Sequence, residues 1–104
     1  MSTILKGLNV LDLTEGMSGS LASMILADNG AEVIKIERPT GDPYRSNPAW
    51  IMWNRGKKSL TLDLKAPSAI TTIKKLIPRA DVFLENFRPG ILDSLGLGYD
   101  SLST

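Results

Sequence analysis

Cysteine and histidine are both absent from the 104-residue sequence. Their absence excludes a disulfide framework, a Ser–His relay and a cysteine nucleophile, and it removes the usual ligands of a zinc site. A chain without disulfides fits the cytoplasm. Any chemistry must therefore come from carboxylates, lysines or another part of a larger protein, and we expect no metal site.

The sequence also has little net charge and no long hydrophobic run. With 12 Lys and Arg against 11 Asp and Glu, the net charge is +1, so no overall positive field would attract nucleic acid. No stretch approaches the roughly 18 apolar residues of a membrane span, and the N-terminus lacks the apolar core of a signal peptide. The composition fits one small soluble domain, and we expect neither nucleic acid nor a membrane as a partner.

Short apolar runs and helical patterns alternate along the chain. Strands are predicted at residues 7–13 (GLNVLDL), 32–37 (EVIKIE), 59–64 (SLTLDL) and 81–85 (DVFLE). Helices are predicted from an N-cap at Ser18 or Ser20 to Asn29, with Gly30 as a left-handed stop; from Pro67 to Pro78; and after Pro89, ending at Gly96 or Gly98. The order β-α-β-loop-β-α-β-α predicts an α/β fold with a parallel sheet and flanking helices.

Residues 38–54 show no clear periodicity. A loop rich in Pro and Gly is followed by the apolar stretch AWIMW, whose form the sequence leaves undetermined. We expect residues 44–54 to expose apolar surface. Trp50 and Trp53 could stack on an adenine ring, but packing in the core or at an interface is the favoured interpretation for such a pair.

Three cations follow predicted strands. Arg38, Lys65 and Arg88 come just after the second, third and fourth strands. The carboxyl ends of parallel strands share one edge of the sheet, where helix N-termini also present free N–H groups, so a phosphorylated ligand could bind there. Charged loops that are simply solvated remain an equal alternative.

A second group of cations lies in NRGKK, before the third strand. Arg55, Lys57 and Lys58 surround Gly56, which suggests either a solvated turn or a cradle for an anion. The nearby strand acids Asp12, Asp63 and Asp81 are interpreted as turn caps or as partners of Lys57 and Lys58.

A dinucleotide site is only weakly supported. The G-x-G-x-x-G fingerprint is missing, because the loop after the first strand offers only Gly16 and Gly19. Glu37 does stand at the end of the second strand, where an acid that binds ribose would lie. No P-loop sequence is present.

Three stretches carry a resemblance that covers nearly the whole chain. They are GLNVLDLTEGMSGSLASMILADNGAEVIKIERPTGD, NRGKKSLTLDLK and ADVFLENFRPGILDSLGLGYDSL. In this order and spacing they resemble the N-terminal portion of class III CoA-transferases, the CaiB/BaiF family. This family includes formyl-CoA transferase, carnitine CoA-transferase and α-methylacyl-CoA racemase. The resemblance implies that residues 1–104 form a Rossmann-like, incomplete first lobe of a larger enzyme.

The resemblance further implies that this lobe binds coenzyme A or an acyl-CoA as substrate, without a tightly bound cofactor. Carried over position by position, the implied contacts are Met17, Ser18, Arg38, Leu62, Asp63, Leu64, Lys65, Asn86, Phe87 and Arg88. Lys65 would then be a phosphate partner at the exit of its strand. The NRGKK cations are left to the fold or to a neighbouring subunit, and Lys57→Ala is expected to change CoA binding little. Two positions depart from the family: Met17 replaces a common Gln, and Ser94 lies where a basic residue is common.

The implied activity moves CoA between an acyl-CoA and a carboxylic acid acceptor, in a protein that folds as a homodimer. The family's catalytic aspartate and Gly-rich segment lie beyond residue 104, so we assign no catalytic residue and expect the chain alone to be inactive. Two alternatives stay open. One is a member of the racemase type, and the other is a truncated, non-catalytic module that binds CoA or a nucleotide.

Overall fold

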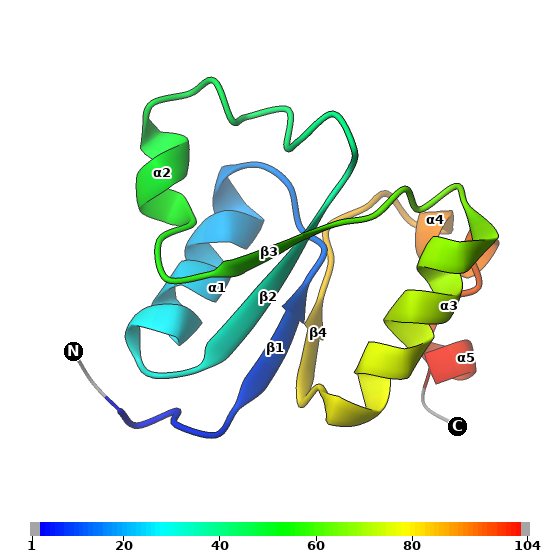
Figure 1. The fold of residues 1–104 in the computed structure, drawn as a ribbon, viewed down its shortest axis with the longest axis horizontal. Helices are drawn as coiled ribbons and strands as arrows, with labels where there is room; N and C mark the ends of the chain where they lie inside the picture. The colour runs from blue at the N-terminus through cyan, green and yellow to red at the C-terminus, as the bar shows by residue number, and fades with distance from the viewer. Residues whose placement is uncertain (1–2, 103–104) are drawn as a thin grey trace.

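A four-stranded parallel sheet organises the computed structural model, which describes residues 3–102 (Figure 1). The strands, in the spatial order β3-β2-β1-β4, are β1 (Asn9–Asp12), β2 (Glu32–Glu37), β3 (Lys58–Thr61) and β4 (Val82–Leu84). The helical elements are α1 (Met17–Asp28), α2 (Ala49–Trp53), α3 (Pro67–Leu76), the 3₁₀ turn η1 (Ile77–Arg79), α4 (Ile91–Ser94) and α5 (Tyr99–Leu102). All three strand pairings are parallel, which confirms the predicted α/β fold.

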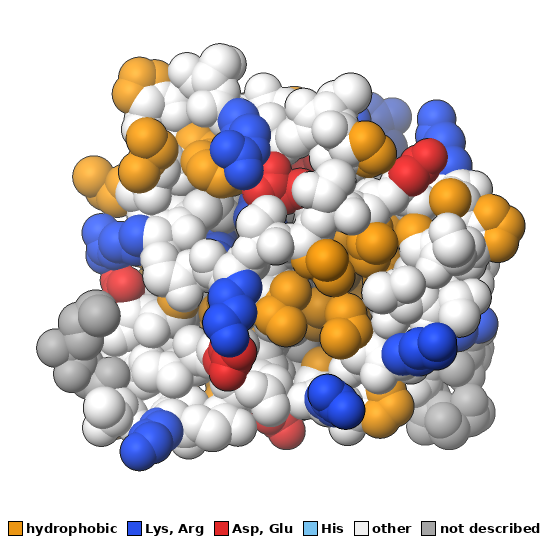
Figure 2. All heavy atoms as spheres, viewed as in Figure 1, with side chains coloured by type: hydrophobic (Ala, Val, Ile, Leu, Met, Phe, Trp, Pro, Cys, Tyr) orange, Lys and Arg blue, Asp and Glu red, His pale blue; other side chains and the backbone are white. Residues whose placement is uncertain are grey.

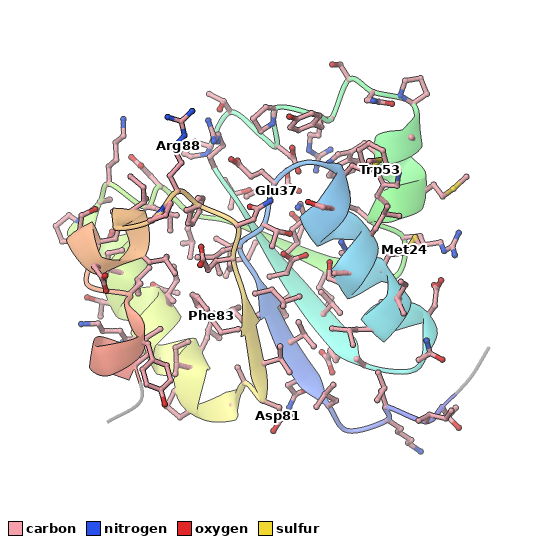
Figure 3. The ribbon with its side chains drawn as sticks, turned by 180° about the vertical axis from the view of Figure 1, so that it is seen from behind. Met24, Glu37, Trp53, Asp81, Phe83 and Arg88 are labelled. Atoms are coloured by element: carbon pink, nitrogen blue, oxygen red, sulfur yellow. The ribbon has the colours of Figure 1, made fainter. Side chains whose placement is uncertain are left out.

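Alternation along the two central strands builds a core on each face of the sheet, because successive side chains point to opposite sides. Toward α1, the buried cluster consists of Val10, Ala31 and Val33. Toward α3, it consists of Leu11, Leu13, Ile36, Ile73 and Leu97. Figures 1 and 3 show α1 and α3 on these opposite faces. The sheet therefore carries helices on both faces, as parallel sheets usually do.

The face of the sheet beneath α1 becomes polar toward its carboxyl edge. By the same alternation, Asp12 follows Val10, and Lys35 follows Val33, and both polar side chains are buried. Helix α1 packs against this polar surface with Ser20 and Ser23, its two buried residues. Ile25, in contrast, is 57% exposed. The position of α1 thus depends on polar contacts as well as on apolar packing.

The start of α1 differs from the prediction. Neither Ser18 nor Ser20 caps the helix; Gly16 occupies the N-cap position with φ 84° and no side-chain cap. Ser20 is instead fully buried within the helix. Gly19 lets the helix approach the loop before it, because a Cβ at this position would lie 2.3 Å from Cβ of Thr14. The predicted left-handed stop is confirmed, since Gly30 has φ 104°.

The remaining boundaries agree with the sequence in order and approximate place. Strand β2 spans the predicted residues 32–37, whereas β1, β3 and β4 are shorter than predicted. Helix α3 ends before Pro78 as expected, and α5 was not predicted. The undetermined stretch AWIMW forms α2, which has no buried residue. Its side chains Ile51 and Met52 are 74% and 59% exposed, which confirms the apolar surface expected for residues 44–54.

The face that carries α3 is only partly covered. Figure 2 shows hydrophobic side chains gathered beside β4 and α3 on this face. Ile34 and Leu76 line a hollow of about 200 Å³ that also includes part of β1. None of the helices within residues 3–102 has the length and apolar character needed to cross a bilayer.

Candidate functional site

An open hollow of about 450 Å³ lies at the carboxyl ends of β1, β2 and β3, and we call it the carboxyl-edge hollow. Its lining residues are Leu13, Glu15, Ile36, Glu37, Arg38, Pro39, Thr40, Leu62, Asp63, Leu64, Lys65 and Phe87. Ligands of open parallel sheets bind at this edge. The hollow therefore coincides with the place where the strand order alone predicts a site.

Most of the predicted contact residues line this hollow. They are Arg38, Leu62, Asp63, Leu64, Lys65 and Phe87. Apolar and positively charged side chains meet there. Leu13 and Ile36 belong to the buried core, whereas Arg38 and Lys65 are exposed to solvent. An apolar surface bordered by cations suits a ligand that has both a hydrophobic or aromatic part and phosphate groups.

Four of the predicted contacts do not line the carboxyl-edge hollow. Met17 and Ser18 are exposed in the first turn of α1. Asn86 makes two hydrogen bonds to the backbone of Glu15. Arg88 lines a neighbouring hollow of about 390 Å³, to which Phe87 also contributes. Figure 3 shows Arg88 at the same end of the sheet as Glu37, and Asp81 at the opposite end.

Arg38 is held by an acid that the sequence did not single out. Its Nε donates to Oε2 of Glu15 at 2.8 Å, and its Nη2 donates to Oε1 at 2.5 Å. These hydrogen bonds raise the pKa of Arg38 above its usual range. The two residues are 23 positions apart, and nothing in the turn TEGMSGS indicates the pairing. Only the pairing of β1 with β2 brings them together.

A second polar cluster lies under α1 rather than in the hollow, and we call it the buried charge network: Asp12, Lys35, Asp42 and Lys57. Asp12 accepts hydrogen bonds from the backbone N–H and hydroxyl of Thr14, at 2.8 and 2.5 Å, and from the hydroxyl of Ser23 at 2.5 Å. Lys57 Nζ completes this shell at 3.4 Å. The predicted role of Asp12 as turn cap and lysine partner is confirmed.

Lys57 is surrounded by acceptors although it is cut off from water. Its side chain is 2% exposed, and its Nζ donates to Oδ1 of Asn54 at 2.7 Å and to the carbonyl of Ser20 at 3.1 Å. Burial lowers the pKa of Lys57, the charge of Asp12 raises it, and the nearby charge of Lys35 lowers it further. Lys57 is thus neither part of a solvated turn nor part of an anion cradle.

The other two NRGKK cations are also engaged with the fold. Arg55 forms a two-point ion pair with Asp28 at the end of α1, at 2.6 and 3.1 Å. Lys58 pairs with Glu32 of the neighbouring strand at 2.5 Å. Neither lines the carboxyl-edge hollow. The family resemblance left these cations to the fold or to a neighbouring subunit. Of these two roles, the contacts support the one in the fold.

Lys35 links the network to the loops at the carboxyl edge. Its Nζ donates to the carbonyl of Thr14 at 2.9 Å and lies 3.2 Å from Oδ2 of Asp42. Both side chains of this ion pair are almost fully buried. The loop after β1 and the loop after β2 are therefore tied to one lysine on the sheet.

The carboxylate of Glu37 is hydrogen-bonded within the protein itself. Arg45 donates to its two carboxylate oxygens at 2.8 and 2.9 Å, and Ser59 donates to it at 3.0 Å. Hydrogen bonds from Arg45 are the main cause that lowers the pKa of Glu37 to about 2. The Arg45 guanidinium also lies 4.2 Å above the ring of Trp50, so this tryptophan contacts a residue of the chain itself. The acid that could have bound a ribose is thus already occupied.

Asp63 and Asp81 have the structural roles expected of strand-end acids. Asp63 Oδ1 accepts the backbone N–H of Lys65 at 3.0 Å, and Asp81 Oδ2 accepts the backbone N–H of Asn9 at 2.8 Å. Within residues 3–102 no three acids come together in a way that could hold a metal ion.

Comparison with known proteins relates this geometry to one family. The sequence model of CoA-transferase family III matches residues 5–104. The chain is 41% identical over 111 residues to succinyl-CoA:mesaconate CoA-transferase of Haloarcula hispanica, a match that covers 94% of this chain and 28% of that protein. It is 42% identical over 108 residues to succinyl-CoA:glutarate CoA-transferase of Homo sapiens, covering 94% of this chain and 25% of that protein.

Solved structures give the same relationship. A CaiB/BaiF family protein from Brucella suis superposes with a TM-score of 0.92 and 37% sequence identity, over 99% of this chain and 31% of that chain. The chain thus spans between a quarter and a third of the length of these relatives. Because the family match takes in every strand of the sheet and the whole lining of the carboxyl-edge hollow, the chain belongs to CoA-transferase family III.

Proposed function

We propose that this chain is the CoA-binding N-terminal part of a class III CoA-transferase, and that the carboxyl-edge hollow receives the nucleotide end of CoA or of an acyl-CoA. The observation that carries this proposal is the meeting of Arg38 and Lys65, from the ends of two neighbouring strands, at one apolar hollow. CoA carries a diphosphate and a 3′-phosphate beside an aromatic base. The hollow offers cations for the former and apolar side chains for the latter.

The residues divide these tasks by their chemistry. Arg38 can bind two phosphate oxygens with one edge of its guanidinium, and Lys65 acts as a point charge. Leu62, Leu64 and Phe87 are half-buried and offer apolar surface to the base. In this proposal the hollow supplies binding, and the thioester exchange with a carboxylic acid takes place on further segments and in a homodimer. The names of two relatives, which join succinyl-CoA with mesaconate or glutarate, support this substrate class.

Arg38→Ala and Lys65→Ala are each expected to raise the dissociation constant of CoA about ten- to a hundredfold. The reason is that a hydrogen bond to a charged group contributes roughly 1.5–3 kcal/mol. Calorimetric titration of CoA into the full-length protein and its variants measures this effect. Dephospho-CoA, titrated in parallel, separates contacts with the 3′-phosphate from contacts with the diphosphate.

The matched control is Lys74→Ala, because Lys74 is an exposed cation on α3 and does not line the hollow. It should leave the dissociation constant unchanged. Lys57→Ala is a poor control, since that lysine is buried in the fold. An equal loss of affinity for Lys74→Ala, or no loss for Arg38→Ala and Lys65→Ala, would show that CoA binds elsewhere. We also expect the chain alone to turn over no acyl-CoA.

A further inference from the structure

Three strand ends are joined through one residue, Glu15. This residue lies in the loop after β1, its carboxylate binds Arg38 after β2, and its backbone binds Asn86 after β4. Glu15 also lines the carboxyl-edge hollow.

The backbone of Glu15 is fixed at two points by one side chain. Asn86 Oδ1 accepts the N–H of Glu15 at 3.1 Å, and Asn86 Nδ2 donates to the carbonyl of Glu15 at 2.6 Å. A side-chain amide has one acceptor and two donors, and here it satisfies both the donor and the acceptor of the same residue. The direction in which the Glu15 side chain leaves the loop is therefore set by the segment after β4.

The carboxylate of Glu15 in turn fixes one edge of the Arg38 guanidinium. Its two oxygens receive Nε and Nη2, so the fork is bidentate. A guanidinium has five N–H groups, and the second edge, formed by Nη1 and Nη2, stays available. Among the contacts within residues 3–102, no protein acceptor for Nη1 is found, and the Arg38 side chain is 51% exposed. The free edge can therefore serve a ligand with two oxygens, such as a phosphate.

We propose that Glu15 is a positioning residue that orients Arg38 toward a phosphate group of the ligand, and that Asn86 acts through Glu15. This inference rests on the proposed function, because it names how that site binds its anion. It differs from the expectation that Asn86 contacts CoA directly. An arginine held in place in the free protein loses less conformational freedom on binding, so Glu15 strengthens binding although its own charge is negative.

Binding measurements on combined variants test this order of action. Glu15→Ala and Asn86→Ala are each expected to weaken CoA binding about three- to tenfold. Both effects should disappear in the Arg38→Ala background and persist in the Lys65→Ala background. Titrations at about 0.5 M salt weaken the repulsion between Glu15 and the phosphates. The change in CoA affinity that remains in Glu15→Ala then reports the orientation of Arg38. Glu15→Gln keeps one acceptor and should lie between wild type and Glu15→Ala.

A second readout does not depend on CoA. The Arg38 Nε–H is expected to give a protected side-chain signal in ¹⁵N NMR spectra of the free chain. This signal should be lost in Glu15→Ala and broadened in Asn86→Ala, while the backbone spectrum shows that both variants stay folded. A signal that is unchanged in Glu15→Ala would overturn the inference.

The two proposals fail in different ways. If the wild-type chain binds no CoA, the proposed function is wrong, and the Arg38 signal still decides whether Glu15 orients this arginine. If wild type binds CoA but the loss in Asn86→Ala persists without Arg38, then Asn86 contacts the ligand directly and the positioning role is wrong.

Discussion

Lys57→Ala is expected to lower the free energy of unfolding by about 3–5 kcal/mol, the range for breaking a buried ion pair by removing one partner. The variant leaves the fully buried Asp12 carboxylate without the lysine with which it forms an ion pair. It also removes the donor to the Ser20 carbonyl and to the Asn54 side chain. Urea unfolding followed by circular dichroism at neutral pH measures the loss.

The neighbouring lysine provides the matched control. Lys58 pairs with Glu32, but its side chain is 70% exposed, so Lys58→Ala should change the free energy of unfolding by less than about 1 kcal/mol. A double variant, Asp12→Asn with Lys57→Met, should recover part of the stability lost in Lys57→Ala, because it removes the unpaired charge. Equal losses for the two lysines would show that the buried charge network does not stabilise the fold.

The wild-type protein is also expected to lose about 2–3 kcal/mol of stability through Glu37 as the pH falls from about 4.5 to about 2. The pKa of Glu37 lies at about 2 in the folded protein, below its ordinary value of 4.5. Because the folded pKa is lowered, the stabilisation is fully present above the unfolded value and disappears as the pH falls through the folded one. Because Arg45, the main partner of Glu37, is half exposed, solvent screening keeps this contribution below the full free-energy equivalent of the pKa difference.

The comparison variant is Glu37→Gln, which cannot titrate. At neutral pH it should be less stable than wild type by the same 2–3 kcal/mol, roughly. This gap should close progressively between about pH 4.5 and about pH 2. Urea midpoints at five or six pH values measure this gap. A gap for Glu37→Gln that does not depend on pH would refute the role of this carboxylate.

The sequence was sufficient for the sheet and for part of the site, for a physical reason. Strand periodicity and the position of strand ends are local properties, and they are enough to predict that Arg38 and Lys65 lie at the same edge of the sheet. The family motifs added Leu62, Leu64 and Phe87, which line the same hollow. Whether these residues bind CoA remains a prediction.

The sequence was insufficient wherever a polar residue owes its burial to a distant partner. Lys35 alternates with Ile34 and Ile36 in a pattern that usually places a lysine in water, yet its side chain is 2% exposed. Its acceptors come from the Thr14 carbonyl and from Asp42. Glu15 was missed for the same reason, because its pairing with Arg38 appears only after the strands have been assembled.

The buried charge network also has a consequence for the order in which the chain folds during its synthesis. Its members come from β1, β2, the loop after β2 and the turn just before β3. An emerging chain that stops short of Lys57 has to bury Asp12 beside Ser23 and Thr14 without an ammonium group, which is unfavourable. The first β-α-β unit should therefore remain loosely packed on the ribosome until the NRGKK turn has left the exit tunnel. A chain that ends at residue 56 should accordingly lack protected amides in β1 by hydrogen exchange, and full protection there would refute this order.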